Sequence, residues 1–156
     1  MIQAKVQLTF PTRLQFAVET GTGHKLIIDD IVGHTGPKPI ELIAAALAGC
    51  TAFDVATVLR RKKHKTLTAY EVSVEAEQKQ LPPQVFTNVH IHHSITGNDI
   101  DTQSVEEAIH LSETKYCSVG AMIRQSGAQI KTTYAIHPAE VESSNKVEAP
   151  GQTTAA

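Results

Sequence analysis

A long run without helix breakers most limits how this chain can fold. From Ile40 to about Lys62 the sequence has no proline, and its one glycine there is Gly49. The half from Ile40 to Cys50 is apolar on nearly every side, and a helix that is apolar all round is a buried one. Pro39 suits the first turn of such a helix, where a missing N–H costs nothing. The sequence therefore predicts a long buried helix over about 40–62.

The length of this helix bears on the assembly of the protein. At 1.5 Å per residue, about 23 residues span about 35 Å, which is more than one small domain readily covers. The chain has 156 residues, the length of one domain. We therefore expect a single domain over 1–137 and a homodimer that buries the helix. The tail over 138–156 is rich in Ser, Thr, Ala, Pro and Glu, so we expect it to be disordered.

Segments with an apolar residue at every second position indicate strands around this helix. They lie at 6–10, 14–18 and 26–28 before the helix, and at 70–76, 85–91 and 129–136 after it. The first three predict an antiparallel meander, and the next two predict a hairpin with one face in water. Asp101 can cap a helix that ends near Leu111, and 118–125 is also compatible with a helix. Because the strands are grouped, the predicted fold class is α+β, with antiparallel sheets around the central helix.

Composition argues against several function classes. The net charge is -2 and 19% of the residues are charged, so no excess of positive charge would attract nucleic acid. The chain has no Trp and few other aromatic residues, so no stacking platform for bases is visible. The start, MIQAKVQLTF, lacks the pattern of a signal peptide, and no uninterrupted apolar stretch reaches membrane-spanning length. We therefore expect a cytoplasmic protein without nucleic-acid or membrane partners.

Two cysteines, Cys50 and Cys117, are the candidate reactive groups. Without an export signal they should be reduced thiols unless they take part in redox chemistry. Cys50 is flanked by Gly49 and other small residues, which leaves room beside its sulfur. Cys117 stands between two helical segments, where unpaired N–H groups at a helix start favour a thiolate. The plain alternative is that Cys50 is a small core hydrophobe.

The stretch from Pro37 to Cys50, PKPIELIAAALAGC, closely resembles the cysteine helix of the OsmC/Ohr proteins. Tyr116-Cys117-Ser118 stands where that family places its second cysteine. The segments 85–90 and 95–100 resemble the YhfA-like branch of the superfamily, and the order of elements fits from about Val6 to Ile136. The resemblance implies an OsmC-like fold and an intertwined homodimer with two interface sites, each holding a cysteine pair.

The resemblance also implies a reaction. In the well-understood members, the first thiolate attacks an organic hydroperoxide, releases the alcohol and becomes a sulfenic acid, which the second cysteine converts to a disulfide. Carried over, Cys50 is the attacking thiol and Cys117 the resolving one. A dithiol reductant, such as a lipoylated protein or thioredoxin, restores the pair. The implied function is reduction of small or lipid-like organic hydroperoxides in oxidative-stress defence, with no cofactor.

This sequence departs from the family pattern around the first thiol. Peroxidatic members bring an Arg that favours the thiolate and a Glu that fixes the Arg. Ile40 stands at the usual Glu position, and Glu41 lies on the opposite side of the helix from Cys50. Arg13 is the best candidate for the Arg, whereas Asp54, one turn after Cys50, would oppose the thiolate. The alternative function is therefore a non-catalytic relative that binds an apolar ligand or senses oxidants.

A second constellation consists of His90, His92 and His93. His90 and His92 point to one face of the expected strand and could clasp a metal ion. No third ligand is near them in the sequence, and a histidine on a wet strand face needs no function. We therefore expect no metal site at these histidines.

Overall fold

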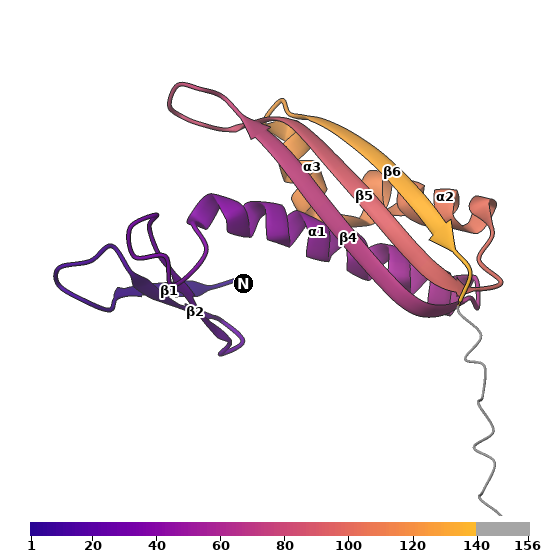
Figure 1. The fold of residues 1–156 in the computed structure, drawn as a ribbon, viewed down its shortest axis with the longest axis horizontal. Helices are drawn as coiled ribbons and strands as arrows, with labels where there is room; N and C mark the ends of the chain where they lie inside the picture. The colour runs from indigo at the N-terminus through magenta and orange to yellow at the C-terminus, as the bar shows by residue number, and fades with distance from the viewer. Residues whose placement is uncertain (140–156) are drawn as a thin grey trace, which may run out of the picture.

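The computed structural model describes residues 1–139, which form two three-stranded sheets and a set of helices (Figure 1). The predicted disorder of the tail concerns residues that, from 140 on, lie outside the described part of the chain. The elements in chain order are β1 (Ala4–Leu8), β2 (Phe16–Thr20), β3 (Lys25–Ile28), α1 (Pro39–Thr57), β4 (Thr66–Gln78), β5 (Phe86–Asn98), α2 (Thr102–Leu111), α3 (Ser118–Gln125) and β6 (Gln129–His137). Wider helical turns at Val58–Lys62 and Ser112–Tyr116 extend α1 and α2.

The N-terminal sheet is the predicted antiparallel meander. Its order is β1-β2-β3, with Val18 of β2 paired to Val6 on one side and Leu26 on the other. The sheet stands at the start of α1, apart from the second sheet (Figure 1). It leaves several large apolar side chains exposed: Val6, Leu8, Phe10, Leu14 and Ile27. This surface has no cover within the described chain.

The long helix begins at Pro39 and runs through Lys62, as the sequence predicts. The carboxylate of Glu41 accepts a hydrogen bond from the Lys38 backbone N–H at 2.8 Å, which stabilises the first turn. Within one chain, however, the helix is not buried on all sides. Its buried positions are Leu47, Thr51, Val55, Val58 and Leu59, whereas Phe53 is 79% exposed and Ile43 44%. One side of α1 packs on the second sheet and the other is open, because the described chain supplies a layer on one side.

By length and composition, Pro39–Lys62 could also cross a membrane, with a mean hydropathy of 2.0 over its most apolar window. Glu41 and Asp54 interrupt this helix, so it is not an uninterrupted apolar stretch of membrane-spanning length. The core helix of a soluble protein can have the same length and hydropathy. In this protein α1 packs against β4, α2 and α3.

The second sheet contains the predicted hairpin and one unexpected pairing. β4 and β5 are antiparallel and have 13 residues each, longer than the alternating segments suggested. β6 pairs with β5 in parallel, so the prediction of purely antiparallel sheets is wrong for this strand. The reason is that α2 and α3 form a crossover, which carries the chain back to the end where β5 began.

A layer of buried polar side chains divides the core between this sheet and the helices. The apolar cluster around Val55 and Ile95 fills one end, and the cluster around Leu47 and Ile91 fills the other. Three polar residues between these clusters are almost completely buried: Thr51, His93 and Ser112. Since burying a polar group costs free energy unless it is hydrogen-bonded, this layer marks the part of the core to inspect for chemistry.

Candidate active site

The two cysteines meet beside this polar layer. Cys50 comes from the middle of α1, and Cys117 is the residue that caps the start of α3. Their sulfur atoms and a carboxylate oxygen of Asp54 all lie within 4.8 Å of one another. Both thiols are free; Cys50 is half-buried and Cys117 is 6% exposed. The fold thus brings together two cysteines that are far apart in the sequence, and Asp54 lies close to both.

The position of Cys117 follows from the helix break before it. The wide turn over Ser112–Tyr116 ends in extended backbone at Cys117, and α3 starts at the next residue. The Gly120 N–H donates to the Cys117 sulfur at 3.3 Å, so the thiol replaces the usual oxygen cap. A side chain at position 120 would lie 3.3 Å from this sulfur, which makes the close approach suit glycine.

Burial, followed by contact with Cys50, raises the pKa of the Cys117 thiol to about 11, although the Gly120 N–H acts in the opposite direction. The negative charge of Asp54 adds to the upward shift. The sequence suggested that a helix start would favour a thiolate here. That effect is present, but burial outweighs it, so Cys117 is a protonated thiol at neutral pH.

Asp54 is held in place by a buried hydroxyl. Ser112 Oγ donates to Asp54 Oδ2 at 3.0 Å and lies 3.2 Å from Thr51 Oγ1. The four ion pairs formed by the described residues do not include Asp54. Among the described residues the carboxylate therefore lies close to two thiols and in no ion pair. Helical spacing predicted its proximity to Cys50.

Arg13 and Glu41 have partners other than the thiols. Arg13 occupies the turn between β1 and β2, where its guanidinium carbon is 5.9 Å from the centre of the Phe10 ring. Within this chain the structure does not group it with the thiols, and its role stays a prediction. Ile40 packs against the apolar cluster around Leu47, and Glu41 caps α1.

Sequence reasoning missed Arg124, a cation on the helix that Cys117 caps. Arg124 Nη1 donates to the Glu113 carbonyl at 3.0 Å, and its Nη2 lies 3.9 Å from the Glu113 carboxylate. A Cβ atom added to Gly120 would lie 3.3 Å from this Nη1 and 3.3 Å from the Cys117 sulfur. Only the fold reveals this neighbour, because the sequence gives Arg124 no distinguishing pattern.

His93 is the second residue whose place the sequence reasoning missed. It is fully buried, and its Nδ1 is hydrogen-bonded to the Tyr70 hydroxyl at 2.7 Å. Its Nε2 has no partner among the described residues. Burial lowers the pKa of His93 to about 4, so the ring is neutral. A signal was available, because His93 is in phase with the buried Val89, Ile91 and Ile95.

The other two histidines of that strand, His90 and His92, lie on its opposite face and are half-buried. His90 Nε2 and His92 Nδ1 are each 2.8 Å from Thr133 Oγ1, on the neighbouring strand β6. In residues 1–139, the group of three close ligand atoms is Cys50, Asp54 and Cys117, and neither of these histidines belongs to it. The pair therefore has a hydroxyl partner and no third ligand in this part of the chain.

Comparisons with known proteins agree with the fold and with the cysteine helix. The sequence model of the family described as OsmC-like protein matches residues 32–133. Protein YhfA of Escherichia coli K12 is 33% identical over 113 residues, which cover 72% of this chain and 84% of YhfA.

Solved structures show the same fold at lower identity. An OsmC-like protein from Mycoplasma pneumoniae has a TM-score of 0.73 at 12% identity, over 88% of this chain and 97% of that chain. The organic hydroperoxide resistance protein OhrB of Bacillus subtilis has a TM-score of 0.58 at 15% identity, over 86% and 98%. These matches confirm the predicted resemblance: the chain belongs to the OsmC-like family and to its YhfA-like branch.

Proposed function

We propose that this protein reduces organic hydroperoxides through Cys50 and Cys117. The observation that carries the proposal is that these two free thiols, from separate elements, meet at one half-buried place. A disulfide-forming mechanism needs such a pair, because the thiol that is oxidised first must be reached by the second. Solved relatives with the same fold carry the name organic hydroperoxide resistance protein.

The thiols divide the reaction between them. The half-buried Cys50 sulfur is the one a substrate can reach, so its thiolate attacks the hydroperoxide; an S–O bond forms, the O–O bond breaks and the alcohol leaves. The Cys117 sulfur then attacks the sulfenic acid of Cys50, forming the disulfide and releasing water. A dithiol reductant, such as a lipoylated protein or thioredoxin, supplies the two electrons that restore both thiols.

The proposal includes a cytoplasmic homodimer. The uncovered apolar side chains of the N-terminal sheet and the open side of α1 support it, because a second copy could cover both. An apolar hollow of about 440 Å³, lined by Leu14, Phe16, Ile28, Ile31 and Pro39 among others, lies between that sheet and the start of α1. In such a dimer the partner chain's N-terminal turn could bring an arginine, Arg13, to Cys50.

Consumption of cumene hydroperoxide, compared with hydrogen peroxide, tests this function in the presence of a dithiol reductant. We expect wild-type protein to turn over the organic peroxide and Cys50→Ser to consume it at the uncatalysed rate, because the nucleophile is gone. We expect Cys117→Ser to be oxidised once at Cys50, to a sulfenic acid that dimedone traps. Mass mapping of oxidised wild type should find the Cys50–Cys117 disulfide. Sustained turnover with both thiols free would contradict the two-cysteine mechanism.

A second candidate function is oxidant sensing or binding of an apolar ligand without turnover. The carboxylate of Asp54 beside the thiols, and the high pKa of Cys117, favour it, since both oppose thiolate formation. In that case the organic peroxide is consumed at background rate by wild type and Cys50→Ser alike. An apolar ligand that is retained through purification equally by both proteins would then identify the binding function.

A further inference from the structure

Three side chains that can lose a proton converge at the candidate active site. The ligand atoms of Cys50, Asp54 and Cys117 lie within 4.8 Å of one another. In a tetrahedral zinc site, Zn–S distances of about 2.3 Å and Zn–O distances of about 2.0–2.2 Å place ligand atoms roughly 3.5–3.8 Å apart. The observed spacing is therefore close to that of a metal site, and small rotations of the side chains would complete it.

The groups around the three ligands also suit an ion. Metal-binding side chains are usually oriented by outer hydrogen bonds. Here Ser112 Oγ donates to Asp54 Oδ2 at 3.0 Å, and the Gly120 N–H donates to the Cys117 sulfur at 3.3 Å. Asp54 and Cys117 can accept these hydrogen bonds and still offer lone pairs to an ion placed between the three side chains.

The charge of the cluster is the independent observation. Asp54 forms none of the ion pairs of residues 1–139, although it is half-buried and close to two thiols. A carboxylate in this position raises the free energy of any thiolate beside it. A bound dication reverses this effect, because it attracts all three groups at once.

From this geometry we propose that Cys50, Asp54 and Cys117 bind one thiophilic divalent cation of the Zn²⁺ class. Two thiolates and a carboxylate are ligands that select such an ion over Mg²⁺ or Ca²⁺. Binding releases one proton from each thiol, and the ion's two positive charges offset the two thiolates. Because Cys50 and Asp54 are half-buried, the ion can enter past them and keep a fourth position for water. The site does not depend on peroxide reduction, and an ion in it holds both sulfurs away from oxidants.

Co²⁺ is a suitable probe, because cobalt thiolates absorb light and Zn²⁺ displaces them. We expect the reduced full-length chain to bind one Co²⁺ per chain, with a thiolate-to-cobalt charge-transfer band that disappears on adding Zn²⁺. Cys117→Ser should weaken this band strongly. Asp54→Asn keeps the shape of the side chain and an acceptor for Ser112, but the amide is a poorer ligand. We expect it to lower the affinity at least about tenfold.

A matched control is Asp99→Asn, the same change at an exposed residue of the turn after β5, which should bind Co²⁺ as wild type does. No stoichiometric band in the wild type, or equal affinity for Asp54→Asn and Asp99→Asn, would overturn the proposal. Circular dichroism of Asp54→Asn confirms that a loss of binding is not a loss of fold. The peroxide assay, run with a chelator present, separates the two proposals: cobalt binding without turnover refutes peroxide reduction alone, and turnover without cobalt binding refutes the metal site alone.

Discussion

His93→Phe is expected to remove most of the loss of folding stability that His93 causes when the pH is lowered. The ring is fully buried, and folding lowers the pKa of His93 from 6.5 to about 4. Between these pH values the unfolded chain binds a proton that the folded chain does not. The free energy of unfolding therefore falls as the pH drops from 6.5 towards 4. Above pH 6.5 the ring is neutral in both states, and this loss of stability is absent. A shift of this size corresponds to about 3 kcal/mol.

The measurement is urea unfolding of wild type and variant at one protein concentration, at neutral pH and near pH 4. We expect the acid-induced loss of stability to be smaller in His93→Phe by about 2–3 kcal/mol. At neutral pH the variant should be less stable by about 1–3 kcal/mol, because the Tyr70 hydroxyl loses its partner. Combining it with Tyr70→Phe should recover part of that loss.

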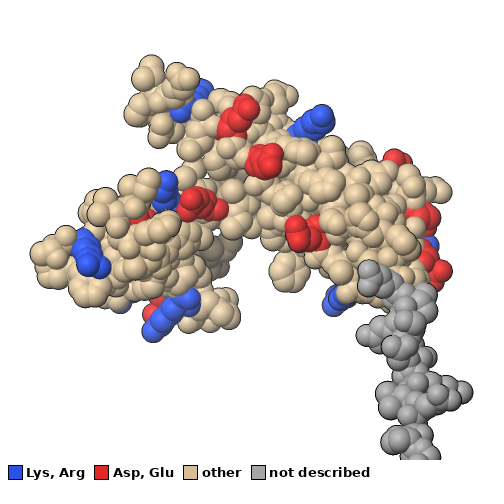
Figure 2. Space-filling model, viewed as in Figure 1, with Lys and Arg blue, Asp and Glu red and all other residues tan. Residues whose placement is uncertain are grey.

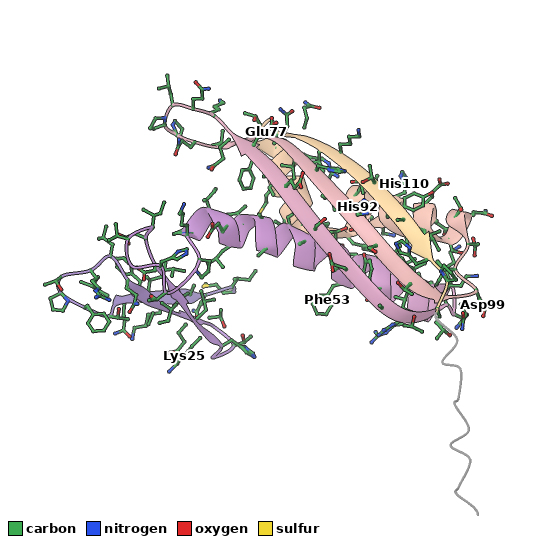
Figure 3. The ribbon with its side chains drawn as sticks, in the orientation of Figure 1. Lys25, Phe53, Glu77, His92, Asp99 and His110 are labelled. Atoms are coloured by element: carbon green, nitrogen blue, oxygen red, sulfur yellow. The ribbon has the colours of Figure 1, made fainter. Side chains whose placement is uncertain are left out.

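His110→Phe is the control, since His110 is exposed on α2 (Figure 3). Its acid-induced loss should equal that of wild type. Equal losses in His93→Phe and wild type would mean that His93 is protonated in the folded state, contrary to its burial.

The helices and most strands could be predicted because their signals are local. Alternation at every second residue predicted β4 and β5, and the run from Ile40 without proline predicted α1. The same rule put His90 and His92 on one face of their strand, and it puts His93 on the opposite face, because successive side chains of a strand face opposite sides. The parallel pairing of β6 could not be predicted this way, since alternation does not say which neighbour a strand takes or in which direction.

Part of the candidate site could also be predicted from local spacing in the sequence. Asp54 follows Cys50 by one helical turn, so their proximity was evident from the sequence, and the structure places them together. The pairing of Cys50 with Cys117 came from resemblance, not from spacing. Ser112 reaches Asp54 from another element, and no local pattern of the sequence could have predicted that contact.

The surface of the described chain supports the proposal of a homodimer. Basic and acidic side chains are scattered over the visible face without forming one continuous patch (Figure 2). The side chain of Phe53 points away from the second sheet, into the open space beside α1 (Figure 3). Burying it in a dimer would remove a large aromatic surface from water, and aromatic side chains near the centre of an interface contribute most to affinity.

Phe53→Asp is therefore expected to dissociate the proposed homodimer. The change removes an aromatic contact and would place an unpaired charge in an apolar interface, which should weaken the dimer at least about a hundredfold. Sedimentation velocity over a dilution series measures this directly. Leu81→Asp is the matched control, because Leu81 is 78% exposed, like Phe53 at 79%, but lies in the β4–β5 hairpin turn. A monomeric wild type, or equal dissociation of both variants, would show that the open side of α1 is not the interface. Dissociation by Phe53→Asp alone would place the partner chain over the helix that carries Cys50.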